Sequence, residues 1–162
     1  MDLNRLFITF FGSGLAPKAP GTVGSFAGLV VGLGLLRVVP METFFMLTIA
    51  ITIIGIFEIN KYEKATGTHD DKSIVIDEVS GMWIALIFAL SVSQSMSYDY
   101  AYELAVILSF LSFRLFDIWK PSTIGVIDRK VKGGLGVMGD DILAGIAGGA
   151  LSSLILMGLE RL

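Results

Sequence analysis

Four long stretches of this 162-residue chain contain no charged side chain, and they restrict its possible folds more than any other feature. They cover residues 19–36, 43–57, 79–98 and 142–158, and a shorter uncharged stretch, 104–113, has aromatic flanks. A helix needs about 20 apolar residues, with about 17 as a lower limit, to cross the hydrocarbon core of a membrane. The sequence therefore predicts an all-α, polytopic membrane protein with four or five transmembrane helices.

The composition agrees with this fold class. Hydrophobic residues make up 54% of the chain and charged residues only 17%, against about 25% charged in soluble domains. The alternative is a soluble helical bundle, because buried core helices also contain apolar runs. The length predicts a single domain, residues 1–162. The chain has no cysteine, which excludes disulfides and thiolate chemistry, and its net charge of −3 offers no footprint for nucleic acid.

The positive charges predict an orientation. With crossings at 23–39, 42–57, 80–96, 100–117 and 142–159, ten of the twelve cations fall on one side, and only Arg37 and Arg161 on the other. The positive-inside rule assigns the cation-rich side to the cytoplasm. The ten cations are Arg5, Lys18, Lys61, Lys64, Lys72, Arg114, Lys120, Arg129, Lys130 and Lys132.

Acidic residues collect on the same side, where ionisable groups beside lipid are costly and tend to be functional. Asp77 and Glu78 stand together at the start of an uncharged segment, where the helix dipole alone would also favour them. Arg114, Asp117 and Lys120 are three residues apart, so they share one helix face, either as part of a site or as a surface ion pair.

Two segments rich in glycine flank these acids. Residues 133–139 contain four glycines, including Gly134 and Gly136, and predict a flexible loop whose backbone could approach an anion. Asp140 and Asp141 follow at the predicted start of the last helix, where one of them could serve as a cap.

The other such segment, residues 12–22, contains two prolines and is either a plain turn or a loop that brings Lys18 and Thr22 to a phosphate. In the last helix, Gly145, Gly148 and Gly149 form a small-residue surface suited to close helix packing. An oligomer formed through this surface is a further possibility.

The acids suggest a metal site. Five carboxylates that converge would repel one another strongly, and a hard cation relieves this repulsion. Oxygen ligands without cysteine, and with His69 as the single histidine, suit Mg²⁺. Arg114 and Lys120 could hold a phosphate, so the pattern predicts metal-assisted hydrolysis of a phosphate ester. His69 fits a polar loop residue better than a catalyst. The five carboxylates are Asp77, Glu78, Asp117, Asp140 and Asp141.

Four motifs resemble the phosphatidylglycerophosphatase A family: P-K-A-P-G-T-V-G-S (17–25), D-D-K-S-I-V-I-D-E-V-S-G-M-W (70–83), F-R-L-F-D-I-W-K-P (113–121) and D-R…G-G-L-G-V-M-G-D-D-I-L-A-G (128–145). Ser122-Thr123 departs from the family, whose members often carry a further proline there. The family pattern maps onto Asp77, Glu78, Arg114, Asp117, Lys120, Asp128, Gly134, Gly136, Asp140 and Asp141.

The resemblance implies a Mg²⁺-dependent phosphatase of the bacterial inner membrane. It would convert phosphatidylglycerophosphate to phosphatidylglycerol and phosphate, and the positive charges place its site on the cytoplasmic face. The five carboxylates would hold Mg²⁺ and perform catalysis. Arg114 and Lys120 would bind the phosphate, with Lys18, Thr22, Arg129, Gly134 and Gly136 as further candidates. Whether water or an aspartate attacks the phosphorus stays open.

A small membrane transporter that binds cations through the carboxylates is the alternative from another class. Transport sites tend to lie near the middle of the bilayer, in broken helices. The acids of this chain stand at helix ends on one side instead, which favours the phosphatase.

Overall fold

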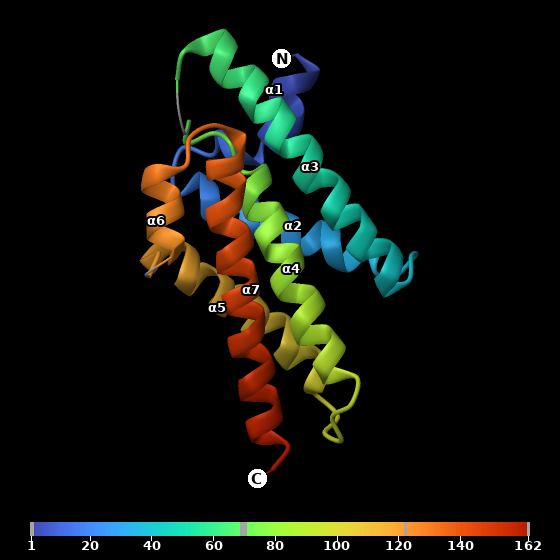
Figure 1. Cartoon of the computed structure of the whole chain (residues 1–162). Coiled ribbons are helices and arrows are strands. Elements are labelled where there is room, and N and C mark those ends of the chain that lie inside the picture. Colours follow the sequence, from blue (N-terminus) through green and yellow to red (C-terminus); the bar gives the residue numbers. More distant parts are fainter. Residues whose placement is uncertain (1, 69–70, 122, 162) are drawn as a thin grey trace.

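The computed structural model describes residues 2–68, 71–121 and 123–161, and within them the fold is all-α (Figure 1). The elements are α1 (Leu3–Ile8), the short 3₁₀ turn η1 (Ser13–Leu15), α2 (Pro20–Leu35), α3 (Met41–Thr66), α4 (Ile76–Ser93), α5 (Ala101–Trp119), α6 (Thr123–Lys130) and α7 (Gly134–Leu159).

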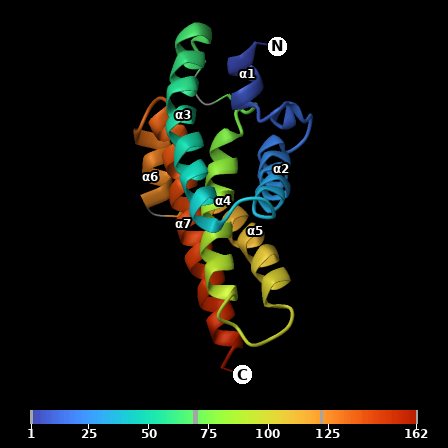
Figure 2. The same cartoon turned by 90° about the vertical axis from the view of Figure 1, so that its right-hand side faces the viewer.

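Helices α4 and α7 lie side by side at the centre of the fold and run in the same direction (Figures 1 and 2). Helix α5 packs against both, and α3 lies against α4 and α7 from another side. Helix α2 packs along the first part of α4 (Figure 2). As a result, α2, α4 and α7 begin, and α5 ends, in the same part of the molecule (Figure 1).

Local chemistry explains several helix ends. Pro20 is the first residue of α2. Its fixed φ suits this position, and its missing N–H costs nothing because the first N–H groups of a helix have no partner within the helix. Gly67 ends α3 in the left-handed conformation, with φ of 71°. Helix α5 ends at Trp119, and Lys120 takes φ of 46° before Pro121. The helix thus ends directly before Pro121, which could not continue it.

Three helices are long and apolar enough to cross a membrane: α3 and α7, with 26 residues each, and α4 with 18. Helix α2 is apolar but shorter, with 16 residues. Helix α5 has 19 residues and carries Glu103, Arg114 and Asp117. Each of the five predicted crossings thus coincides with a helix, and three of these helices are candidate spans in the described part of the chain.

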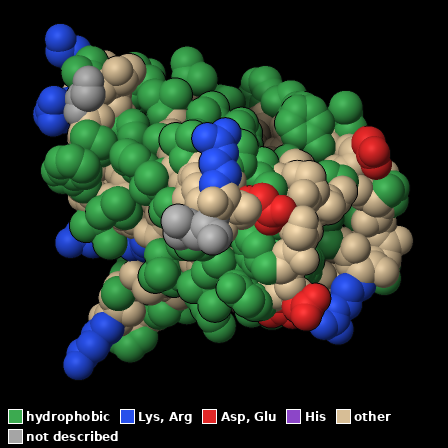
Figure 3. Space-filling view, turned by 90° about the horizontal axis from the view of Figure 1, so that it is seen from below, with side chains coloured by type: hydrophobic (Ala, Val, Ile, Leu, Met, Phe, Trp, Pro, Cys, Tyr) green, Lys and Arg blue, Asp and Glu red, His purple; other side chains and the backbone are tan. Residues whose placement is uncertain are grey.

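The surface fits lipid rather than water. Large apolar side chains are exposed along several helices, including Phe26 at 58%, Phe57 at 67% and Leu154 at 63%. Figure 3, which views the end of the molecule toward which α7 runs, shows hydrophobic side chains over most of that face. Soluble monomers rarely expose large contiguous apolar patches. The membrane class is therefore supported over the soluble bundle.

Glycines set the close approach of α7 to its neighbours, as the small-residue surface predicted. A β-carbon on Gly145 would collide with the backbone of Gly81 in α4. A β-carbon on Gly148 would collide with the backbone of Phe113 in α5. These glycines are buried within the chain, so this surface is not free to form an oligomer.

The predicted loop over residues 133–139 is wrong, because α7 begins at Gly134. The glycines of this segment serve close packing within a helix. A β-carbon on Gly134 would meet the carbonyl of Ile56 in α3, and one on Gly136 would meet the carbonyl of Val131. Gly133, with φ of 76°, is the residue of the segment that uses the freedom of glycine at positive φ.

Replacing Gly145 with alanine should lower the stability of the fold. The added methyl group has no room against Gly81, and overpacking typically costs about 1–3 kcal/mol. Gly158→Ala is the matched control in the same helix, because nothing lies within 4 Å of the added carbon, and alanine favours a helix by up to about 1 kcal/mol. Thermal unfolding in detergent measures both. Equal melting temperatures for the two variants would contradict this packing.

Candidate active site

A cavity of about 220 Å³ lies where α2, α4 and α7 begin and α5 ends. All five carboxylates that the sequence singled out line it, from α4, α5 and α7. Lys72 and Lys120 also line it, as does the backbone of Gly21 and Gly136. The predicted convergence of acidic side chains is therefore present in the structure.

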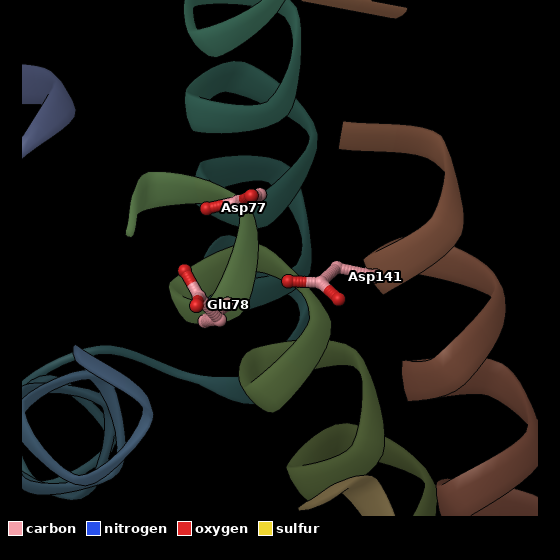
Figure 4. Close-up of side chains that lie close together, drawn as sticks. All are labelled: Asp77, Glu78 and Asp141. Atoms are coloured by element: carbon pink, nitrogen blue, oxygen red, sulfur yellow. The ribbon is translucent and has the colours of Figure 1, made fainter. Parts of the chain in front are cut away.

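Three of these carboxylates form a compact cluster (Figure 4). Asp77 and Glu78 stand in the first turn of α4, and Asp141 faces them from α7. One carboxylate oxygen from each residue lies within 4.8 Å of the other two. Asp77 is 8% exposed and Asp141 only 3%.

The packing of α4 on α7 creates this cluster. Gly81 follows Asp77 by four residues and Gly145 follows Asp141 by four, so each pair shares one helix face. The two helices run in the same direction and touch at Gly81 and Gly145. One turn earlier, the same register therefore places Asp77 opposite Asp141. The glycine contact brings the helix axes close enough for the carboxylates to meet.

Buried oxygen atoms of the cluster have unused capacity. Oδ1 of Asp77 and Oε2 of Glu78 are buried and accept no hydrogen bond from the described residues. None of the cluster's three residues forms an ion pair within that part of the chain. Buried polar atoms without partners are rare, and each requires an explanation.

A divalent cation fits this cluster. Three carboxylates at such short range repel one another, and a cation removes the repulsion. The donors are all oxygen, which suits a hard ion such as Mg²⁺ rather than Zn²⁺. The unpartnered atoms of Asp77 and Glu78 would then become ligands.

Two of the other carboxylates of the cavity are held by cations, and the third, Asp71, accepts hydrogen bonds from Tyr62 and Ser73. Asp117 forms an ion pair with Nη1 of Arg114, and Oδ2 of Asp140 lies 2.6 Å from Nζ of Lys120. The first pair has the predicted spacing of three residues, but its side chains are only 14% and 13% exposed. It is therefore not the surface ion pair of the alternative interpretation.

Helix α2 positions Arg114. The guanidinium donates to Oγ of Ser25 and to Oγ1 of Thr22, at 3.2 Å each. Ser25 in turn donates to the carbonyl of Gly21 at 2.7 Å. The Nε of Arg114 is buried without a hydrogen-bond partner among the described residues. The sequence does not predict this role of Ser25, because the contact between α2 and α5 is not visible in sequence.

Several predicted residues stand apart from the cavity. Lys18 is exposed and does not line it, and Thr22 reaches Arg114 instead. Arg129 is exposed on α6, against Gly125. Gly134 packs against α3, and its N–H donates to Asn60. His69 and the side chain of Asp128 lie outside the described residues.

Two of the alternative interpretations can also be compared with the structure. Asp77 and Glu78 do occupy the first turn of α4, where the helix dipole favours acids. Asp140 and Asp141, however, lie beyond the first turn of α7, so neither caps that helix. The capping interpretation assumed the wrong helix start.

These features define a class of protein: a helical membrane protein with a buried carboxylate cluster beside fixed cations. Residues 6–156 match the family model of phosphatidylglycerophosphatase A, and the chain belongs to this family. The family resemblance seen in the motifs is thereby confirmed. So are the predicted activity, conversion of phosphatidylglycerophosphate to phosphatidylglycerol, and the class of phosphoric monoester hydrolase. The transporter alternative is not supported.

Similar proteins include two with the name phosphatidylglycerophosphatase A. That of Escherichia coli K12 is 39% identical over 88% of this chain and 77% of its own length. That of Haemophilus influenzae is 38% identical over 88% and 82%. A Bacteroides thetaiotaomicron protein, provisionally named phosphatidylinositol-3-phosphatase, is 38% identical over 94% and 90%. No solved structure matches the chain.

A divalent cation should stabilise the folded protein through the cluster. Ligands that bind only the folded state raise its stability, so millimolar Mg²⁺ should raise the melting temperature. Asp141→Asn should lose this gain, yet be at least as stable as the parent in EDTA, because one of three like charges is gone. Thermal unfolding in EDTA and in Mg²⁺ measures this. Asp99→Asn, an exposed acid outside the cavity, should keep the gain. An unchanged gain in the Asp141 variant would contradict the site.

Proposed function

We propose that this chain hydrolyses the terminal phosphate of phosphatidylglycerophosphate at the cavity, with Mg²⁺ held by Asp77, Glu78 and Asp141. One observation carries the proposal: three clustered carboxylates, two of them with buried unpartnered oxygens, share a cavity with Asp117, Lys120 and Asp140, and Arg114 is paired with Asp117 at its edge. When bound, Mg²⁺ would polarise the phosphate ester and neutralise charge that develops on its oxygens.

Arg114 and Lys120 are proposed to bind the phosphate. Arg114 is held by α2 and has a spare donor at Nε, and Lys120 stands at the end of α5 beside Asp140. Donors fixed before the reaction stabilise developing negative charge without the cost of reorganisation. Asp117 and Asp140 orient these cations and limit their motion. Asp117 and Asp140 are therefore proposed as site residues that act mainly through Arg114 and Lys120.

The proposed location is the bacterial inner membrane, as a multi-pass protein with its site toward the cytoplasm. Ten of twelve Lys and Arg residues fall on the site's side in the five-crossing arrangement, and positive charge favours the cytoplasmic side. In this arrangement the three candidate spans α3, α4 and α7 are joined by α5 and by the shorter α2, which gives four or five membrane helices. The lipid substrate would lie in the membrane with its headgroup at the helix ends, where the cavity lies.

Phosphate release by the detergent-purified protein tests the proposed function. We expect release from phosphatidylglycerophosphate in Mg²⁺, and loss of release in EDTA that added Mg²⁺ restores. Phosphatidylinositol 3-phosphate serves as the comparison lipid, since one relative carries that name. If the folded protein released no phosphate from the first lipid, the proposed substrate would be wrong. Release undiminished by EDTA would contradict the role of the cation.

Replacing Asp117 with alanine should greatly reduce turnover while the protein still inserts and folds. Arg114 would lose its carboxylate partner and its fixed direction. The loss of one positioned donor typically costs about 10²–10³-fold in kcat. Asp99→Ala is the matched control, because Asp99 is exposed and does not line the cavity. Full activity in the Asp117 variant would remove this residue from the site.

A further inference from the structure

The substrate of the proposed function carries two phosphates, and they differ in chemistry. A phosphomonoester at one end of the headgroup glycerol is hydrolysed, and a phosphodiester at the other end joins the headgroup to diacylglycerol. Arg114 and Lys120 account for the phosphomonoester. The phosphodiester keeps a negative charge throughout the reaction, so a site selective for this lipid needs a further cation in the same cavity.

Lys72 is the cation that the cavity offers. It lines the cavity together with Asp77, Glu78 and Lys120, but its side chain is exposed. Lys120 is bound to Asp140, whereas Lys72 forms no ion pair with the described residues. A lysine at the open side of an acidic cavity is therefore available to a second anionic group of the ligand.

A tight turn fixes the backbone of Lys72. The carbonyl of Asp71 accepts from the N–H of Ile74 at 2.8 Å, and its side chain accepts from the N–H of Ser73 at 2.9 Å. The hydroxyl of Tyr62 in α3 also donates to the Asp71 carboxylate, at 2.8 Å. The hydrogen bond from the Ser73 backbone is the main cause that lowers the pKa of Asp71, and the hydrogen bond from Tyr62 adds to it. The Asp71 carboxylate is therefore ionised at neutral pH and continues to hold the turn.

Two further contacts tie this turn to the rest of the fold. The N–H of Val75 donates to the carbonyl of Ile8 at 2.9 Å. Gly14 lies so close to the carbonyl of Ser73 that a β-carbon would collide with it. The turn directly precedes α4, which carries Asp77 and Glu78. The backbone of Lys72 thus has a defined place relative to the carboxylate cluster, at the lining of the same cavity.

We infer that Lys72 binds the phosphodiester of the lipid headgroup and thereby selects substrates with two phosphates. The inference rests on the proposed function, because it assumes that the phosphomonoester binds at Arg114 and Lys120. Lysine suits this role, since its ammonium is a compact charge on a flexible stem that contacts phosphate without strict geometry. Lys72 takes no part in breaking the P–O bond, so it affects binding and not the chemical step.

Steady-state kinetics of Lys72→Gln tests this assignment. The surface KM for phosphatidylglycerophosphate in mixed micelles should rise about fivefold, as expected for loss of one partly solvated charge contact. The kcat should stay within about twofold of the parent. The inhibition constant of inorganic phosphate, which lacks the diester, should also stay within about twofold. Lys72→Arg should restore most of the KM.

The matched control is Lys64→Gln, which removes an exposed lysine of α3 that does not line the cavity. It should leave all three constants unchanged. An unchanged KM in Lys72→Gln would overturn the inference. So would an equal rise in KM and in the phosphate inhibition constant, because Lys72 would then only balance the charge of the cavity. Absence of activity in the parent protein would instead refute the proposed function.

Discussion

The contact between Gly81 and Gly145 is the constraint on which the site depends. Two helices can bring their backbones this close together where small residues meet, and here both residues are glycines. Asp77 and Asp141 each precede one of these glycines by four residues, so the same register brings them together at the end of the interface. The carboxylate cluster is thus a product of helix packing. All three of its residues stand on helices, which fix the directions of their side chains.

The charges of the cavity indicate that this packing of carboxylates requires a bound cation. Six carboxylates line one cavity: Asp71 accepts hydrogen bonds from Tyr62 and Ser73, and Asp117 and Asp140 are paired with Arg114 and Lys120. The remaining three lie within 4.8 Å of one another, an arrangement that is costly without a bound cation. A site at the helix ends suits a lipid phosphatase, because the headgroup of a lipid lies at the membrane surface while its chains stay in the bilayer. Figure 4 shows that the two acids of α4 and the acid of α7 face a common centre.

The sequence predicts much of this arrangement but not all of it. Hydropathy located every large helix, and the scarcity of acids in so apolar a chain identified five of the six carboxylates of the cavity, all but Asp71. The sequence prediction failed at residues 133–139, where the high density of glycines indicated a loop but the structure has the start of α7. A glycine that permits close helix packing and one that permits a turn look the same in sequence. The pairing of Lys120 with Asp140 and the placing of Lys18 outside the cavity depend on contacts between distant segments, which spacing along the chain does not encode.

Locating the cation directly is the sharpest test of the central claim, that α4 and α7 together create a divalent-cation site. Crystals of the detergent-solubilised protein grown with Mn²⁺, which accepts the same oxygen ligands as Mg²⁺, would show the ion by anomalous scattering. The account predicts a strong anomalous peak bounded by carboxylate oxygens of Asp77, Glu78 and Asp141. A cation bound elsewhere in the protein, with these three carboxylates empty at a concentration that supports activity, would contradict it.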